Sequence, residues 1–342
     1  MRSAAPPGVA VSALESFLAE SVPGLVNGQL DVRLLSGGRS NLTYLVTDGR
    51  DRWVLRRPPL GHVLATAHDM AREFRVLQAL HPTDVPVPEP IVRAGPEVIG
   101  APFYLMGFVE GIVPRERRWL ETLSGATAVE LAETLIEVLA HLHRIVPGDV
   151  GLSDLGRPTG YLDRQLSRWT RQLQASRSRD VDDLVRLGER LKERLPRRGT
   201  AALVHGDYRL DNVVVDPEGT QVRSVLDWEM ATLGDPLTDL ASAVVWWDGI
   251  RGLDSPVAAV PGDVPGYPSG NVLVEAYARR TGHDLAELPW YFGFAFYKIA
   301  VIFEGIHYRA RQGLTVGEGF DRLGALVPGL VERGHTALRA WS

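Results

Sequence analysis

The residues best suited to chemistry lie close together between positions 203 and 229. Asp207 and Asn212 fall on a polar loop after a short apolar run, and Asp227 ends a later apolar run. Carboxylates beside buried strands are tolerated when they are paired or bind a cation. Asp-x-x-x-x-Asn followed by a strand-borne Asp is the pattern that kinase-type phosphoryl transfer uses. In that chemistry the first Asp, here Asp207, accepts the hydroxyl proton, while Asn212 and Asp227 hold Mg²⁺ against the nucleotide phosphates.

Three short motifs follow one another in this region. They are His205-Gly206-Asp207 with Asn212, then Leu226-Asp227-Trp228-Glu229, then Gly234-Asp235-Pro236 with Asp239-Leu240-Ala241. In this order, within about forty residues, they form a strong combined signal. On these motifs the sequence resembles the aminoglycoside phosphotransferase and choline kinase-like family. The stretches WVLRRPP, REF and HGDYRLDN look most like the kinase-like domains that occur fused to acyl-CoA dehydrogenases.

The resemblance implies an α+β, bilobal protein-kinase-like fold with a small antiparallel-sheet N-terminal lobe and a larger, mainly helical C-terminal lobe. We expect residues 1–106 to form the nucleotide-covering lobe, residues 107–111 the hinge, and residues 112–342 the catalytic and acceptor-binding lobe. The resemblance further implies ATP as co-substrate, Mg²⁺ as cofactor and a hydroxyl of a small molecule as the acceptor.

The first part of the chain supplies candidate nucleotide contacts. Gly37, Gly38 and Ser40 lie on a joint between two strand-like runs. Without a Cβ, backbone N–H groups there can approach phosphate oxygens, although a plain hairpin turn is an equal alternative. Arg56, on a later strand-like run, stands where related kinases carry the lysine that pairs the phosphates. Arginine keeps the charge, but it is longer and not equivalent to lysine.

Glu73 falls on a helix that apolar spacing predicts over residues 65–80. In kinases a helix Glu holds the strand cation, so we expect an ion pair with Arg56, with a solvent-facing Glu as the alternative. Arg57 is a competing candidate for the strand cation, but strand alternation puts its side chain on the face opposite to that of Arg56.

Glycines flank a short segment after the strand-like run 103–106, which suits a hinge. The resemblance places the backbone of Gly107 and Val109 against the purine edge, with Met106 at the back of the pocket. A simple strand-to-helix connection is the alternative.

From Thr127 onward the pattern is mainly helical, with an aromatic-rich helix over residues 290–311 that is typical of a core element. His205 is interpreted as a structural residue of the loop. Asp235 and Asp239 are interpreted as residues that cap a helix and brace the loop.

Composition excludes several classes of protein. The chain has 342 residues and no cysteine, so it has no disulfide framework and no Cys metal site. Its net charge of −5 argues against nucleic-acid binding. No signal-peptide core and no long apolar run is present, so we expect a cytoplasmic protein without membrane attachment. Lys192 and Lys298 are the two lysines.

The acceptor remains open at this stage. An aminoglycoside pocket needs several carboxylates on the C-terminal helices to meet a polycation, and the carboxylates there stand among many aromatics and arginines: Glu275, Glu287, Glu304 and Glu318. The similarity to the fused domains suggests a hydroxyacyl-CoA acceptor instead, with an aminoglycoside or other antibiotic kinase as the alternative. A non-catalytic pseudokinase is a further alternative, supported by Arg56. A metal-dependent hydrolase would need more His ligands than the loop supplies.

Overall fold

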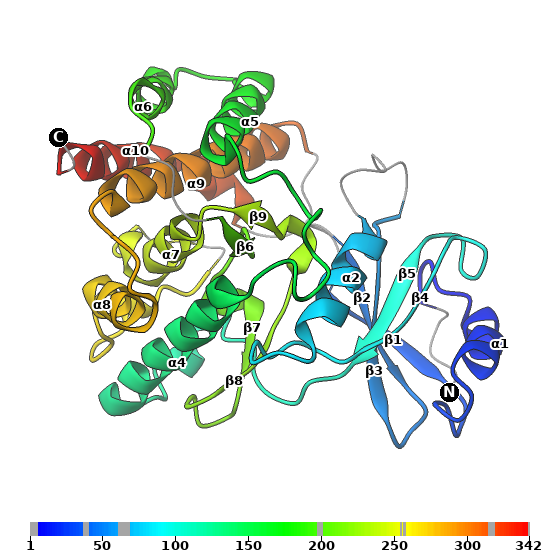
Figure 1. Cartoon of the computed structure of the whole chain (residues 1–342). Coiled ribbons are helices and arrows are strands. Elements are labelled where there is room, and N and C mark those ends of the chain that lie inside the picture. The colour runs from blue at the N-terminus through cyan, green and yellow to red at the C-terminus, as the bar shows by residue number, and fades with distance from the viewer. Residues whose placement is uncertain are drawn as a thin grey trace. The chain divides into compact units, whose positions relative to one another are not determined.

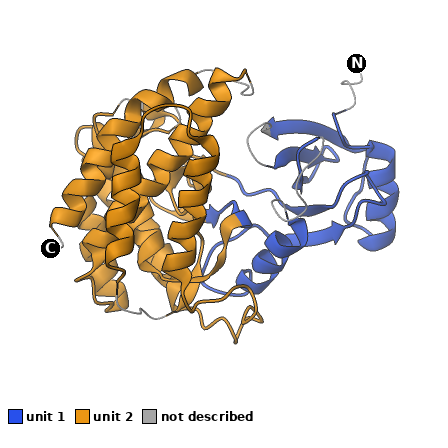
Figure 2. Cartoon of the chain, turned by 90° about the horizontal axis from the view of Figure 1, so that it is seen from above, with its two compact units in different colours: residues 1–110, 224–229 blue, residues 111–223, 230–342 orange. Residues whose placement is uncertain are grey.

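The chain is described by a computed structural model that covers residues 6–36, 41–60, 69–196, 201–253, 255, 258–313 and 319–340. Contacts divide the chain into two compact units (Figure 2). The first contains residues 1–110 and 224–229, and the second contains residues 111–223 and 230–342. The segment 224–229, which the expected boundaries gave to the C-terminal lobe, thus belongs by its contacts to the first unit.

The first unit is built on a five-stranded antiparallel sheet with the strand order β1-β2-β3-β5-β4 (Figure 1). Its strands are β1 (Asp31–Ser36), β2 (Leu42–Thr47), β3 (Arg52–Arg57), β4 (Pro90–Ala94) and β5 (Phe103–Gly107). Each corresponds to a strand-like run of the sequence.

Two helices cover opposite faces of this sheet. They are α1 (Val11–Ser21) and α2 (Met70–Leu80). Phe17 of α1 meets Phe103 with ring centroids 5.7 Å apart, and Phe74 of α2 meets Tyr104 at 5.9 Å. Because neighbouring residues of a strand point to opposite faces, the two helices lie on different sides of β5. The predicted helix begins at Met70, because the Asp69 side chain accepts the Arg72 N–H and caps it there.

The second unit is mainly helical. Its helices are α3 (Arg117–Leu120), α4 (Gly125–Arg144), α5 (Tyr161–Ser176), α6 (Asp182–Glu193), α7 (Leu237–Val244), α8 (Gly270–Thr281), α9 (Leu288–Arg311) and α10 (Leu323–Arg339), with a π-helical turn at Val245–Gly249. Short strands form two further pairs: β6 (Ala202–Val204) with β9 (Thr232–Gly234), and β7 (Val213–Val215) with β8 (Val222–Val225), whose last two residues are counted with the first unit. A small antiparallel sheet beside a mostly helical remainder confirms the expected fold class.

Helix α9 is the central element of the second unit, since α5, α6, α7 and α10 all pack against it (Figure 1). Its aromatic side chains are buried, including Trp290, Tyr291, Phe294, Tyr297 and Phe303. They are core residues, as their spacing indicated. Among the described residues, no helix combines the length and apolar character needed to cross a membrane.

Candidate active site

In the second unit, the loop after β6 is seated on a buried carboxylate from α7. The Asp239 side chain is 1% exposed and accepts the His205 N–H at 2.6 Å and the Gly206 N–H at 2.8 Å. Buried backbone donors must find acceptors, and a carboxylate makes the stronger charge-assisted kind of hydrogen bond. Asp239 therefore fixes the start of the loop, which agrees with its interpretation as a brace.

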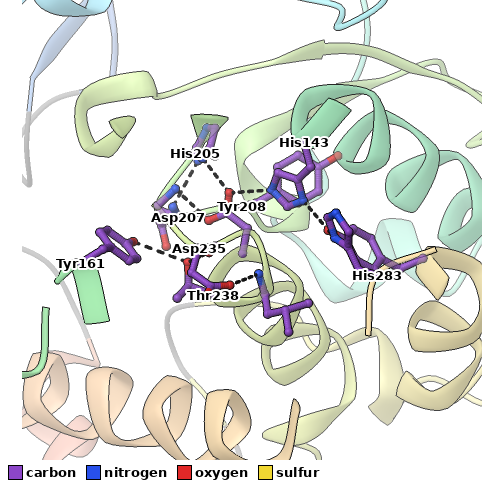
Figure 3. Close-up of polar contacts among 12 residues, drawn as sticks. His143, Tyr161, His205, Asp207, Tyr208, Asp235, Thr238 and His283 are labelled. Carbon is purple, nitrogen blue, oxygen red and sulfur yellow. Dashed lines mark hydrogen bonds and ion pairs between the residues drawn. The ribbon is translucent and has the colours of Figure 1, made fainter. Parts of the chain in front are cut away.

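His143 and His205 belong to a network of polar contacts around this loop (Figure 3). His143 Nε2 lies 3.4 Å from the Asp239 carboxylate, and its Nδ1 meets the Tyr277 hydroxyl at 2.8 Å. Burial alone would raise the pKa of Asp239, but the hydrogen bond and charge of His143, the charge of His205 and the Gly206 amide together lower it. The carboxylate is thus held ionised beneath the loop.

Asp207 and Asn212 point toward each other within the loop. The Asn212 amide nitrogen donates to the Asp207 carbonyl at 2.9 Å and to its carboxylate Oδ2 at 3.0 Å. Asn212 belongs to a 3₁₀ turn over Leu210–Asn212, which brings a residue five positions later back to Asp207. Because the Asn212 amide nitrogen donates to Asp207, the amide oxygen is the atom of this side chain that can bind a cation.

A buried hydrogen bond and the conformation of one glycine also fix the loop. The Tyr208 hydroxyl, which is fully buried, donates to the Leu135 carbonyl of α4 at 2.7 Å. Gly206 has a φ of 86°, and a Cβ added there would lie 2.8 Å from the Met230 carbonyl oxygen. Only glycine fits this left-handed, crowded position without strain.

In the first unit, Arg56 and Glu73 form the expected ion pair, with Nε 3.5 Å from Oε2. Arg56 pairs in register with Tyr104, so its side chain points to the face that α2 covers. Glu73 is 1% exposed and also accepts hydrogen bonds from the Tyr104 hydroxyl and the Asn41 amide, each at 2.8 Å. Burial raises the pKa of Glu73, while Arg56 opposes this shift. Arg57 points to the other face, where it contacts the Gly8 carbonyl.

Asp227 joins the same cluster in an unusual backbone conformation. Its carboxylate Oδ1 lies 2.9 Å from Arg56 Nη2. Its φ of 65° makes it a left-handed non-glycine residue, a conformation that costs most residues free energy and that Asp and Asn adopt more readily. Burial alone would lower the pKa of Arg56, but Tyr104, Glu73 and Asp227 raise it. Such strain is often kept where it orients a functional side chain.

Asn212 in the second unit and Asp227 in the first have side chains of the kind that binds Mg²⁺, and their joint binding of one ion stays a prediction. The Asn212 amide oxygen and the Asp227 carboxylate are hard oxygen ligands of the type that Mg²⁺ prefers. Among the described residues there is no group of three or more His, Asp or Glu side chains that could hold a metal. Mg²⁺ usually takes one or two carboxylates and completes its shell with water and substrate phosphates, so a sparse protein site suits it.

The remaining predicted nucleotide contacts are less defined by the structure. Gly37, Gly38 and Ser40 lie outside the described residues. Met106 is buried in β5, where it pairs with Val54. The Gly107 N–H donates to the Glu89 carbonyl at 2.8 Å, and Val109 is half-buried. Their roles toward a nucleotide stay predictions.

Sequence reasoning missed several residues of these clusters. Lys298 Nζ donates to the Gly206 carbonyl at 2.6 Å from α9. Asn41, Tyr104 and His143 complete hydrogen bonds to Glu73 and Asp239. The rarity of lysine was a usable signal for Lys298, whereas no local pattern marks the others.

These features are those of kinase-like phosphotransferases, in which positioned carboxylates and a strand cation serve phosphoryl transfer to a hydroxyl. Residues 31–285 match the model of the family described as "APH: Phosphotransferase enzyme family". The chain belongs to this family of phosphotransferases.

Solved structures agree on the fold. A protein from Ralstonia eutropha, provisionally described as an aminoglycoside phosphotransferase, has a TM-score of 0.83 at 30% identity and covers 96% of this chain and 98% of its own. The macrolide 2'-phosphotransferase of Brachybacterium faecium has a TM-score of 0.60 at 21% identity, covering 92% and 98%. An aminoglycoside 2'-phosphotransferase bound to GDP has a TM-score of 0.63 at 16% identity, covering 96% and 99%. The bilobal kinase-like fold is thereby confirmed.

The curated relatives, unlike the solved structures, are not named as phosphotransferases. Acyl-CoA dehydrogenase family member 11 of Rattus norvegicus is 33% identical over 333 residues, covering 95% of this chain and 42% of the relative. Acyl-CoA dehydrogenase family member 10 of Mus musculus is 30% identical over 335 residues, covering 94% and 30%. The chain therefore spans less than half the length of the relatives it matches, which agrees with the expected likeness to kinase-like domains in such proteins.

Proposed function

We propose that the chain transfers the γ-phosphoryl group of Mg²⁺-ATP to the hydroxyl of a hydroxyacyl-CoA. The acceptor oxygen forms a bond to the γ-phosphorus, the bond to the bridging oxygen breaks, and ADP leaves. Asp207 orients the acceptor hydroxyl and takes its proton. The observation that carries the proposal is the pairing of Asp207 with Asn212 on a loop whose first amides are bound by Asp239.

Other residues of the chain have supporting roles. Asn212 and Asp227 would hold Mg²⁺, which supplies charge neutralisation at the phosphates when bound. Arg56 would clamp phosphate, with Glu73 holding the guanidinium in place. Gly37, Gly38 and Ser40 would cover the phosphates, while Met106, Gly107 and Val109 would meet the base. Positioning and electrostatic stabilisation carry most of the rate in such a site.

Charges of both signs surround Lys298 in the second unit. Burial lowers the pKa of Lys298, Asp207 and Asp239 oppose this shift, and the charges of Arg168 and Arg209 lower the pKa further. The carboxylates of Asp207, Asp211 and Asp239 stand among these cations, and Arg209 forms an ion pair with Asp211. The charges therefore balance one another and favour neither a cationic nor an anionic acceptor.

Aromatic faces also accompany these cations. The Arg209 guanidinium lies 4.1 Å from the centre of the Trp246 ring, and Lys298 Nζ lies 5.6 Å from that of Trp169. Both rings are buried, so these contacts fix the positions of the two cations. The acceptor class is supported instead by the names of the curated relatives, which are called acyl-CoA dehydrogenase family members.

The test is transfer from Mg²⁺-ATP to a panel of hydroxyacyl-CoAs, aminoglycosides, choline-like alcohols and sugars, with products read by mass. A hydroxyacyl-CoA that gains one phosphate is the expected result. Asp207→Asn should lower the rate on the order of 10²- to 10⁴-fold. Glu218→Gln, which removes an exposed carboxylate from the β7–β8 turn, is the matched control and should leave the rate unchanged. Transfer to an aminoglycoside and to no hydroxyacyl-CoA would contradict the proposed acceptor.

One observation favours a second candidate, a nucleotide-binding pseudokinase. Arg56 stands in place of the usual lysine, and its guanidinium is tied to the carboxylate that would bind Mg²⁺. Nucleotide binding without transfer to any acceptor, together with Mg²⁺-independent affinity, would favour this candidate.

A further inference from the structure

Lys298 is one of two lysines in a chain that otherwise uses arginine for its basic side chains. It projects from α9, and its side chain is half-buried. The other lysine, Lys192, is exposed in the last turn of α6. The half-buried Lys298 therefore has an exposed lysine of the same unit as its matched control.

Lys298 and Asp239 hold the two ends of one residue's backbone. The Gly206 N–H donates to Asp239 Oδ1 at 2.8 Å, and the Gly206 carbonyl accepts from Lys298 Nζ at 2.6 Å. A carboxylate from α7 and an ammonium from α9 thus clamp opposite poles of the residue that precedes Asp207. Charge-assisted hydrogen bonds are roughly twice as strong as neutral ones, so the orientation of this backbone is strongly specified.

The local backbone restricts the same peptide. Gly206 is in the left-handed region, and a Cβ there would meet the Met230 carbonyl, so the peptide has little room to settle otherwise. The Gly206 carbonyl is part of the peptide bond to Asp207. Any rotation of that peptide changes the direction in which the Asp207 side chain leaves the backbone.

The environment of Lys298 is not that of a structural ion pair. Among the residues that the structure describes, no carboxylate lies within salt-bridge distance of Nζ, which contacts the Gly206 carbonyl and the Trp169 ring. Taking a cation partly out of water without a carboxylate partner is costly, and such positions are enriched at functional sites.

We propose that Lys298 is a positioning residue for phosphoryl transfer, which holds the Gly206 carbonyl and thereby sets the orientation of Asp207. This inference rests on the proposed role of Asp207 as the base. It adds a residue from the C-terminal part of the chain, 91 positions from Asp207 in the sequence (298 − 207), that no motif of the loop contains.

The kinetic test compares Lys298→Met, Lys298→Arg and Lys192→Met. Methionine keeps the unbranched stem against Trp169 and removes the donor and the charge. We expect kcat to fall on the order of 10²-fold in Lys298→Met, the effect of a small misplacement of a catalytic group, with the KM for ATP within about twofold. Lys298→Arg, which can still donate to a carbonyl, should recover part of the loss, and Lys192→Met should match the wild type.

A second measurement does not depend on turnover. Hydrogen exchange read by mass spectrometry should be faster in Lys298→Met over the peptide 203–212, and unchanged there in Lys192→Met. Unchanged exchange over this peptide overturns the inference whatever kcat does. An unchanged kcat in an active Lys298→Met enzyme also overturns it and leaves the proposed function standing. If the wild type transfers phosphate to no acceptor, the proposed function fails, and exchange alone decides whether Lys298 holds the loop.

Discussion

Arg56 and Asp227, which are 171 positions apart in the sequence, form an ion pair with 2.9 Å between Nη2 and Oδ1. Glu73 lies on the Nε side of the same guanidinium. The arginine that replaces the usual strand lysine therefore bridges two carboxylates of the first unit. Its planar fork can do this, whereas a lysine ammonium offers a single point of charge.

Arg56→Met should destabilise the protein in a pH-dependent way. Glu73 is buried, and its pKa already lies above the ordinary value of 4.5, so removing the cation raises this pKa further. A raised folded-state pKa means that stability is lost as pH rises through it. We expect a loss on the order of 3 kcal/mol near neutral pH and a smaller loss at acid pH, where Glu73 is protonated. Urea unfolding across this pH range measures it.

The control is Arg57→Met on the opposite face of β3. Arg57 is equally buried but contacts the carbonyls of Gly8 and Pro58. Its loss should cost about 1–2 kcal/mol with no pH dependence over the same range. If the two variants showed the same pH profile, the coupling of Arg56 to Glu73 would be refuted.

Asp227 combines two properties that substitutions can separate. Asn tolerates its left-handed backbone but lacks the charge, whereas Ala lacks both properties. We expect Asp227→Asn to lose about 1 kcal/mol with the charge that pairs with Arg56, and Asp227→Ala to lose roughly 1 kcal/mol more. In both variants, Mg²⁺ should no longer strengthen nucleotide binding. Calorimetric titration of nucleotide in the presence and in the absence of Mg²⁺ measures this. Retained Mg²⁺ dependence in both variants would remove Asp227 from the metal site.

Much of this arrangement follows from local sequence patterns. Strand alternation separates Arg56 from Arg57, and the five-residue spacing brings Asn212 back to Asp207 through a single 3₁₀ turn. Helical spacing identifies the core character of α9. Such relationships span a few residues, so the periodicities of strand and helix determine them.

The rest depends on tertiary packing that no window of sequence contains. The partners of the loop come from α4, α7 and α9, and their contacts require all three helices to be in place. The left-handed conformation of Asp227 and the assignment of segment 224–229 to the first unit are likewise tertiary. Asp is a residue type that tolerates such a conformation, but its presence does not require it.

Gly206→Ala should impair both stability and turnover. The new Cβ would face the left-handed strain and also the Met230 carbonyl oxygen at 2.8 Å. Gly282→Ala is the matched control, since Gly282 has a φ of 68° with nothing within 4 Å of its added Cβ. We expect about 1 kcal/mol of destabilisation for Gly282→Ala from strain alone and more for Gly206→Ala. Turnover should fall only in Gly206→Ala, and equal losses in both would argue against a crowded loop.

Asp239→Asn should weaken the hydrogen bonds that hold the start of the same loop. The amide keeps one oxygen acceptor for two backbone N–H donors, so one buried donor is left with a weakened partner. We expect a loss on the order of 3 kcal/mol near neutral pH, together with reduced turnover. The pKa of Asp239 is lowered from 3.8, so the stability it contributes is fully present above that value and is lost as pH falls toward the folded-state pKa. Denaturant unfolding should therefore show a constant gap from wild type at mildly acid and neutral pH that narrows only below about pH 4. A gap that instead grew on acidification would contradict an ionised Asp239 beneath the loop.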